Sequence, residues 1–204
     1  MIHASFAVTV GWLGVSLGAV STYVQYQRSR QVSTEGISLA TWYQFALMSV
    51  FWISYGLAVH QIVIVAGSLI CLPMQVSIVA RLSPLQNMTT IVRSSAFILV
   101  CSLAPTLLLG WSAGVLGTGI VMVANRFPQI ATLVRHPGDL GVSALSWLMG
   151  AVCSLMWVAF YLGARLWAPL VVTALAMAGN LAIAALAQWR HREARAFDYE
   201  PATA

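Results

Sequence analysis

Tryptophan, hydroxyl and amide side chains that could bind a small solute recur at matching positions in two parts of this sequence. The first set advances in steps of four, four, three and three residues, which places it on one face of a helix: Ser38, Trp42, Ala46, Ser49 and Trp52. The second set repeats this spacing: Ser143, Trp147, Ala151, Ser154 and Trp157. The rings of Trp52 and Trp157 could stack on a sugar or another flat solute. Ser49 and Ser154 could bond that solute or let helices pack closely.

Polar groups in two further apolar segments also share helical faces. Ser68 and Gln75 lie seven residues apart in one segment, and Thr173 and Asn180 lie seven residues apart in the other. An amide at membrane depth needs a partner, either a neighbouring helix or the hydroxyl groups of a solute. All four residues are therefore candidates for solute binding.

A proline and a lone cation interrupt another apolar segment. Pro128 removes a backbone donor, which suits a hinge or a fixed kink. Arg126 precedes Arg135 by nine residues, about 13 Å along a helix, so its charge should meet water in a cavity or the carbonyls freed by Pro128. It could act as a gate, bonding helix-end carbonyls or Gln129, or as a ligand for an anion; the absence of a second cation favours the gate. The residues that could line the cytoplasmic half of the cavity are Ser21, Gln25, Asn125 and Gln129, and Gln25 and Gln129 are also candidates for a gate or hinge.

Membrane-spanning helices must position these residues. Of 204 residues, 60% are hydrophobic and 7% are charged, and the mean hydropathy is +0.84, which is too apolar for the surface of a soluble domain. A bilayer core needs roughly 20 apolar residues per helix. The segments that meet this test are 6–24, 37–58, 61–80, 94–111, 112–134, 143–163 and 166–188. We expect an all-α membrane protein of seven transmembrane helices, with its three cysteines as small core residues.

The arginines predict how the helices are oriented. One side of the membrane would hold Arg28, Arg30, Arg81, Arg93, Arg135, Arg190, Arg192 and Arg195, and the other side only Arg165. The positive-inside rule then places the N-terminus outside and the C-terminus in the cytoplasm, with the plasma membrane as the expected location. The net charge of +5 therefore needs no nucleic-acid partner. The five acidic residues all lie outside the predicted spans, which argues against proton coupling: Glu35, Asp139, Glu193, Asp198 and Glu200.

The sequence contains an internal repeat. A shift of 105 residues aligns 36–57 with 141–162 and matches both tryptophan pairs, and a shift of 104 aligns 21–25 with 125–129. Residues 6–80 and 112–188 are therefore two copies of a three-helix unit. Helix 94–111 is a linker that lets both copies have the same orientation, and residues 189–204 form a cytoplasmic tail. This arrangement is a 3+1+3 bundle.

These features together resemble the SWEET (MtN3/saliva) sugar transporters within the wider PQ-loop group. The first copy carries "VQYQRSRQVSTEGISLATW" and "WISYGL", and the second carries "FPQIATLVRHPGDLG" and "WVAFYLG". The resemblance implies a passive, alternating-access carrier with Trp157 in contact with the substrate. Two departures stand out: Val24-Gln25 replaces the first Pro-Gln, and the asparagine pair of sugar carriers is matched only by Asn180 with Gln75, or by Thr173 with Ser68.

We expect a uniporter for a small neutral, sugar-like solute. Metal-ligand spacing, a phosphate-binding loop and an activated nucleophile are all missing from the sequence, so neither an enzyme nor a cofactor or metal site is expected. The expected partners are the solute and membrane lipid, and a homo-oligomer is left open. One alternative is a carrier of amino acids or small organic anions, favoured if Arg126 lines the cavity. Another is a non-transporting sorting receptor, because the KDEL receptor shares the seven-helix organisation.

Overall fold

The structure, a computed structural model, describes residues 2–135, 141–163 and 167–198. Every regular element in these ranges is helical, which confirms the predicted all-α class. The elements are α1 (Ile2–Gln31), α2 (Leu39–Ala58), α3 (Ile62–Arg81), the 3₁₀ turn η1 (Pro84–Asn87), α4 (Met88–Ile98), the π-helical η2 (Leu99–Leu103), α5 (Ala104–Leu109), α6 (Trp111–Ala124), α7 (Arg126–Arg135), α8 (Ala144–Gly163) and α9 (Trp167–Asp198).

Several of these helices have the length and composition of membrane spans. Four stretches of the described chain qualify: Ile62–Arg81, Pro84–Leu109, Ala144–Gly163 and Leu170–Glu193. They support an integral membrane protein. Helices α6 and α7 have 14 and 10 residues, so each alone is shorter than a span, because the break at Asn125 divides them.

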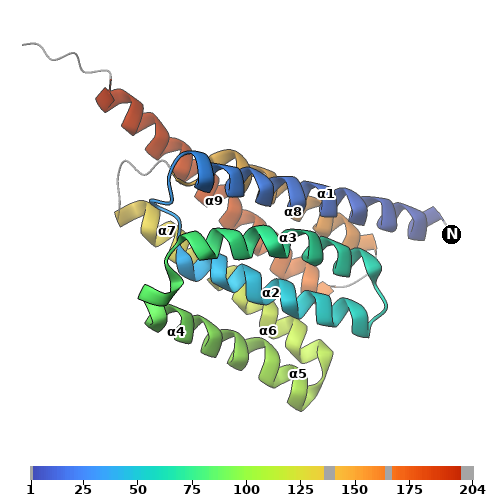
Figure 1. The fold of residues 1–204 in the computed structure, drawn as a ribbon. Coiled ribbons are helices and arrows are strands. Elements are labelled where there is room, and N and C mark those ends of the chain that lie inside the picture. The colour runs from blue at the N-terminus through green and yellow to red at the C-terminus, as the bar shows by residue number, and fades with distance from the viewer. Residues whose placement is uncertain (1, 136–140, 164–166, 199–204) are drawn as a thin grey trace, which may run out of the picture.

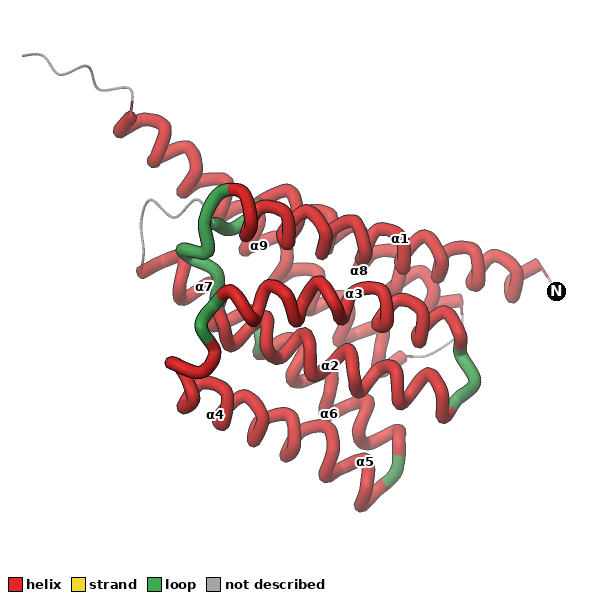
Figure 2. The backbone as a smooth tube through the Cα atoms, in the orientation of Figure 1, coloured by secondary structure: helices red, strands yellow, loops and turns green. Residues whose placement is uncertain are grey.

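Each half of the chain packs its helices in the same order. Helix α3 contacts both α1 and α2, and α9 likewise contacts α6, α7 and α8. The halves meet mainly where α1 lies along α8, whereas α2 touches α6 and α7 only sparsely. The segment from α4 to α5 runs along the outside of α2 and α6 (Figures 1 and 2). The N-terminal end of α1 and the last turns of α9 point to opposite ends of the bundle (Figure 1).

The first helix of the second half is broken, whereas its counterpart is continuous. Asn125 separates α6 from α7, three residues before Pro128, while α1 runs through 30 residues. Pro128 has no N–H for a bond to Ala124, and its ring would clash with that carbonyl in a regular helix. Val24, at the matching position, imposes neither restriction.

The helices at the arginine-rich end are longer than the predicted spans. Helix α9 continues through Asp198, so much of the expected tail 189–204 is helical. Arg190 stabilises this extension: it donates to the carbonyl oxygens of Leu133 (3.1 Å) and Val134 (3.0 Å) at the end of α7 and pairs with Glu193 at 2.7 Å. Hydropathy predicts where a helix leaves the apolar layer of the membrane. The observed helix is longer, because its backbone hydrogen bonds continue into the polar region.

Candidate solute-binding site

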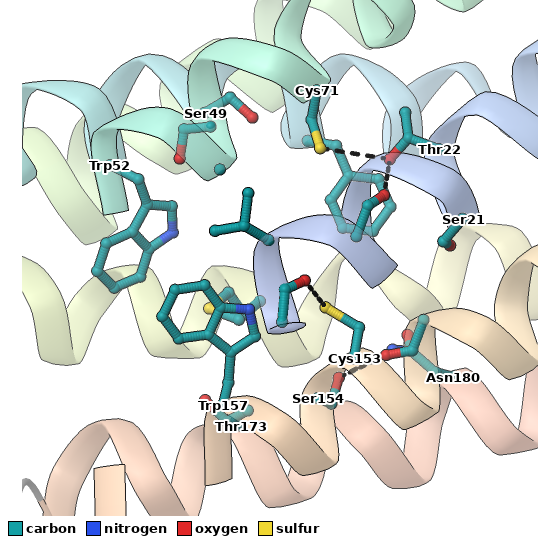
Figure 3. Close-up of a pocket in the computed structure, with 18 of the residues that line it drawn as sticks. Ser21, Thr22, Ser49, Trp52, Cys71, Cys153, Ser154, Trp157, Thr173 and Asn180 are labelled. Atoms are coloured by element: carbon teal, nitrogen blue, oxygen red, sulfur yellow. Dashed lines mark hydrogen bonds between the residues drawn. The ribbon is translucent and has the colours of Figure 1, made fainter. Parts of the chain in front are cut away.

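A partly enclosed cavity of about 260 Å³ lies between the two halves (Figure 3). Its walls come from helices of both halves, so neither half could form it alone. Among the predicted binding residues, those that line it are Ser49, Trp52, Ser68, Gln75, Ser154, Trp157, Thr173 and Asn180, and the predicted gate residue Arg126 and Ser21 join them.

Trp52 and Trp157, the two rings that the sequence suggested for stacking on a solute, line the cavity. Figure 3 shows both indole rings beside the cavity, Trp52 coming from α2 and Trp157 from α8. Trp157 stacks on Tyr161 with ring centroids 5.9 Å apart, and Trp52 meets Tyr55 edge-on at 5.6 Å. These neighbours hold the rings in place, so each ring can offer a fixed face to a flat solute.

Trp42 and Trp147 close the other side of the cavity. Each is 5% exposed, and their ring centroids lie 6.4 Å apart with the planes at 72°. The sequence placed both residues on the correct helical face but did not select them as site residues. Their matched positions in the repeat were the available signal, because equivalent residues of two related halves meet near the axis that relates them.

The predicted amides bond within their own halves while also lining the cavity. Ser49 donates its hydroxyl to Oε1 of Gln75 at 2.8 Å, and Nδ2 of Asn180 donates to the hydroxyl of Ser154 at 3.3 Å. The two pairs occupy equivalent positions of the repeat. Each therefore stabilises contact between the second and third helices of its half, and the Nε2 group of Gln75 is left for a solute, whereas Oδ1 of Asn180 accepts from Arg126.

Arg126 lies at the end of the cavity near Trp42 and Trp147. It is 5% exposed, and its Cζ lies 5.7 Å from the centre of the Phe45 ring. Its guanidinium bonds helix carbonyls, as the gate hypothesis expected, but also the amide oxygens of Asn125 and Asn180. Gln129, the other expected partner, is bonded elsewhere.

Gln25 and Gln129 form a reciprocal pair of bonds between the halves, which we call the glutamine clamp. Gln25 donates to the carbonyl of Gly141 (3.0 Å) and accepts from the backbone N–H of Ser143 (2.8 Å). Gln129 does the same in the opposite direction, donating to the carbonyl of Gly36 and accepting from Ser38 N–H at 2.9 Å. Each glutamine thus fixes the loop before the other half's second helix.

The clamp corrects part of the predicted cavity lining. Gln25, Gln129 and Asn125 are fully buried and are not among the residues that line the cavity. The two glutamines are used by loop backbone of the opposite half. Asn125 accepts from the hydroxyl of Thr41 through its backbone carbonyl at 2.7 Å and holds Arg126 through Oδ1 at 2.8 Å. It is a positioning residue, because these two oxygens hold Thr41 and Arg126.

Direct backbone contact tightens the same end of the bundle. A Cβ added to Gly141 would lie 2.2 Å from the carbonyl oxygen of Glu35, so only glycine allows the two loops to approach this closely. The hydroxyl of Ser146 also donates to the carbonyl of Ser21 at 2.6 Å, which mirrors the bond from Thr41 to Asn125. The cavity is therefore closed beyond Trp42 and Trp147.

Two of the three cysteines that were expected in the core, Cys71 and Cys153, also line the cavity. Cys71 accepts a weak bond from the Thr22 hydroxyl at 3.7 Å, and Cys153 donates to the carbonyl of Gly14 at 3.1 Å. Their separation in sequence hid this placement, because only packing of α3 and α8 around α1 brings both to one space.

Comparison of the chain with protein-family models, curated proteins and solved structures finds no match. The resemblance to the SWEET transporters therefore rests on the residues of the internal repeat.

Proposed function

We propose that the chain is a SWEET-like membrane carrier that moves a small, hydroxylated, sugar-like solute through this cavity by alternating access. The observation that carries the proposal is the cavity itself: both halves line it, aromatic rings and polar groups face it, and matched bonds close one end. A solute held between two related halves can be released to either side when the halves rock against each other. The 3+1+3 arrangement of two parallel repeats is part of the proposal.

The glutamine clamp is the proposed cytoplasmic gate. It lies at the end of the bundle where α1 and α7 end, which is the arginine-rich end assigned to the cytoplasm by the positive-inside rule. Opening it would separate Gln25 from Gly141 and Gln129 from Gly36, and the break at Asn125 gives α7 a hinge for this motion. In this topology the N-terminus is outside and the C-terminus is cytoplasmic.

The proposed transport is uniport. Arg126 is the one charged side chain among the lining residues that the structure describes, and no Asp, Glu or His is in that set. A carrier driven by protons needs a group that titrates near neutrality where the solute binds. Flux should therefore follow the solute gradient and respond little to a pH gradient.

Uptake by proteoliposomes tests this proposal. Vesicles containing the purified full chain are offered labelled sugars, organic acids and amino acids, with Trp157→Ala protein as the matched control. Saturable uptake that the variant loses, without accumulation driven by a pH gradient, is the expected result. Accumulation driven by protons would overturn uniport.

Two further outcomes of the same assay are informative. Arg126 lines the cavity, and this favours an anionic solute for the same carrier, as the sequence analysis expected for that case. A sorting receptor would bind a peptide tail and show no flux for any solute. Binding of a peptide without uptake would replace the carrier proposal.

A further inference from the structure

Arg126 places an unbalanced positive charge in the cavity wall. Among the acidic side chains that the structure describes, Glu35 is exposed in a loop and Glu193 pairs with Arg190 at 2.7 Å. Neither contacts Arg126. A charge at membrane depth is costly unless it is paired or faces a water-filled cavity, so the residue needs a counter-charge or a function.

The bonds of Arg126 fix the side chain but do not neutralise it. Nε donates to the carbonyl of Ala176 (3.0 Å) and to Oδ1 of Asn180 (2.9 Å), and Nη1 donates to Oδ1 of Asn125 (2.8 Å) and to the carbonyl of Met122. All four acceptors are uncharged. None of the bonds described for this residue uses Nη2, which carries two of the five N–H groups of a guanidinium. Because Arg126 lines the cavity, these two donors remain for a solute.

The surrounding backbone is shaped for the arginine. A Cβ added to Gly179 would lie 2.7 Å from Cδ of Arg126 and 3.4 Å from its Cγ, so the side chain occupies space that only glycine leaves free. The first half lacks both features: Thr22 matches Arg126, and Met74 matches Gly179. The arginine and the glycine next to it are thus a paired departure of the second half from the repeat.

The equivalent place in the first half is neutral and already satisfied. Thr22 donates to the carbonyl of Gly18 at 2.9 Å and to Cys71 at 3.7 Å. The cavity is therefore pseudo-symmetric in its rings and serines but carries charge on one side only. A solute that uses this charge would bind with its polar end toward the second half.

We infer that the solute is a small organic monoanion, whose carboxylate binds Nη2 of Arg126 while its body extends into the cavity toward Trp52 and Trp157. This inference rests on the proposed carrier function and names its solute class. One fixed cation balances one negative charge, so a dianion would bring an unpaired charge into the cavity. A zwitterionic amino acid would bring an ammonium group, and the described lining has no carboxylate to receive it.

Binding to the purified protein tests the charge directly. The full chain in detergent is heated with sodium gluconate or glucose, and with sodium lactate or 1,2-propanediol, each against sodium chloride at equal ionic strength. We expect at least one monocarboxylate to raise Tm and its uncharged partner to have no such effect, because a ligand that binds only the folded state stabilises it. Equal effects of both partners, or no effect of either carboxylate, would overturn the inference.

Variants locate the binding to Arg126. Arg126→Gln keeps hydrogen-bonding capacity but loses the charge, so it should weaken monocarboxylate binding by about tenfold or more. Arg126→Lys keeps the charge and should retain part of the binding, and Gly179→Ala should weaken binding by displacing the side chain. Arg135→Gln is the matched control, because Arg135 is exposed on the same helix and should bind as the parent does. If Arg126→Gln and Arg135→Gln lose binding equally, the site is not at Arg126.

Membrane potential separates failure of this inference from failure of the carrier proposal. Uniport of a monoanion moves one negative charge, so a potassium potential that is positive inside the vesicles should accelerate gluconate or lactate uptake. Saturable uptake of glucose that ignores the potential would leave a carrier but refute the anion. Absence of carrier-dependent uptake for every probe would refute both.

Discussion

The two halves of the bundle share the glutamine clamp but differ in their first helices and in charge. In each half, a glutamine in the last turns of the first helix bonds the loop of the opposite half. In each half, a serine also accepts a backbone N–H at the start of the second helix, which is α2 in the first half and α8 in the second. The first half has a continuous helix and a threonine where the second has a break and Arg126. In the proposed carrier, the repeated glutamines would serve closure between the halves, and the unmatched break and arginine would serve movement and the binding of charge.

The two contacts between the halves also differ, according to whether the first helix is continuous or broken. Helix α1 lies along α8 over much of its length, whereas the broken α6–α7 pair has few contacts with α2. A straight helix can keep ridge-to-groove contact along its partner, and a broken helix cannot. We expect the α1–α8 contact to persist during transport and the α7 side to move.

Among the features that the two halves share, substitution of Trp52 or Trp157 should have the largest effect on transport. Trp157→Ala and Trp52→Ala should each reduce transport by about tenfold or more, because a lost stacking face worth about 1.4 kcal/mol corresponds to that factor. Uptake by proteoliposomes at equal protein content is the measurement. Leu148→Ala, an exposed position on α8, is the control for loss of a large apolar side chain. Normal transport by both tryptophan variants would place the site elsewhere.

Clamp variants should have nearly equal effects in the two halves. Gln25→Ala and Gln129→Ala each leave a buried backbone N–H and carbonyl without their partner, which should destabilise the closed state by about 1–3 kcal/mol. The rate at which Cys71 and Cys153 react with a small thiol reagent should rise in both variants, since both cysteines line the cavity. A strong effect from one glutamine alone would show that the gate is not symmetric.

Substitution of Pro128 should have the smallest effect on transport, and its structural effect should be limited to the second half. Pro128→Ala permits a continuous helix across Asn125, so we expect transport to slow several-fold while solute affinity is retained. Amide hydrogen exchange near residues 124–128 measures the change directly, because a new backbone bond protects these positions. Val24→Pro is the reciprocal test and should loosen α1. Unchanged exchange and rate in Pro128→Ala would mean that the break does not act as a hinge.

Sequence reasoning found the all-α class and most of the cavity because periodicity fixes the face of a helix. Trp52, Trp157, Gln75 and Asn180 all line the cavity that their spacing suggested. It named Gln25 and Gln129 as gate candidates but also expected them to line the cavity, because no side-chain pattern encodes their partners, which are backbone atoms of a distant loop.

Other features depended on contacts between helices that are remote in sequence. The space that Gly179 leaves for Arg126 and the approach of Cys71 and Cys153 to one cavity follow from packing of α9, α3 and α8. Helix ends beyond the apolar layer, such as that of α9, depend on bonds like those of Arg190. Hydropathy contains no information on either.

Exchange across the membrane tests the central claim, that one solute site between the halves opens to each side in turn. Proteoliposomes are loaded with unlabelled gluconate, and uptake of labelled gluconate is measured against vesicles loaded with sodium chloride, with labelled glucose as the parallel probe. The account predicts saturable uptake that the internal gluconate accelerates, because a loaded carrier returns its site to the outside, and loss of this uptake in Trp157→Ala. Uptake of both probes that is linear in concentration and indifferent to internal solute, or no protein-dependent uptake of either, would contradict it.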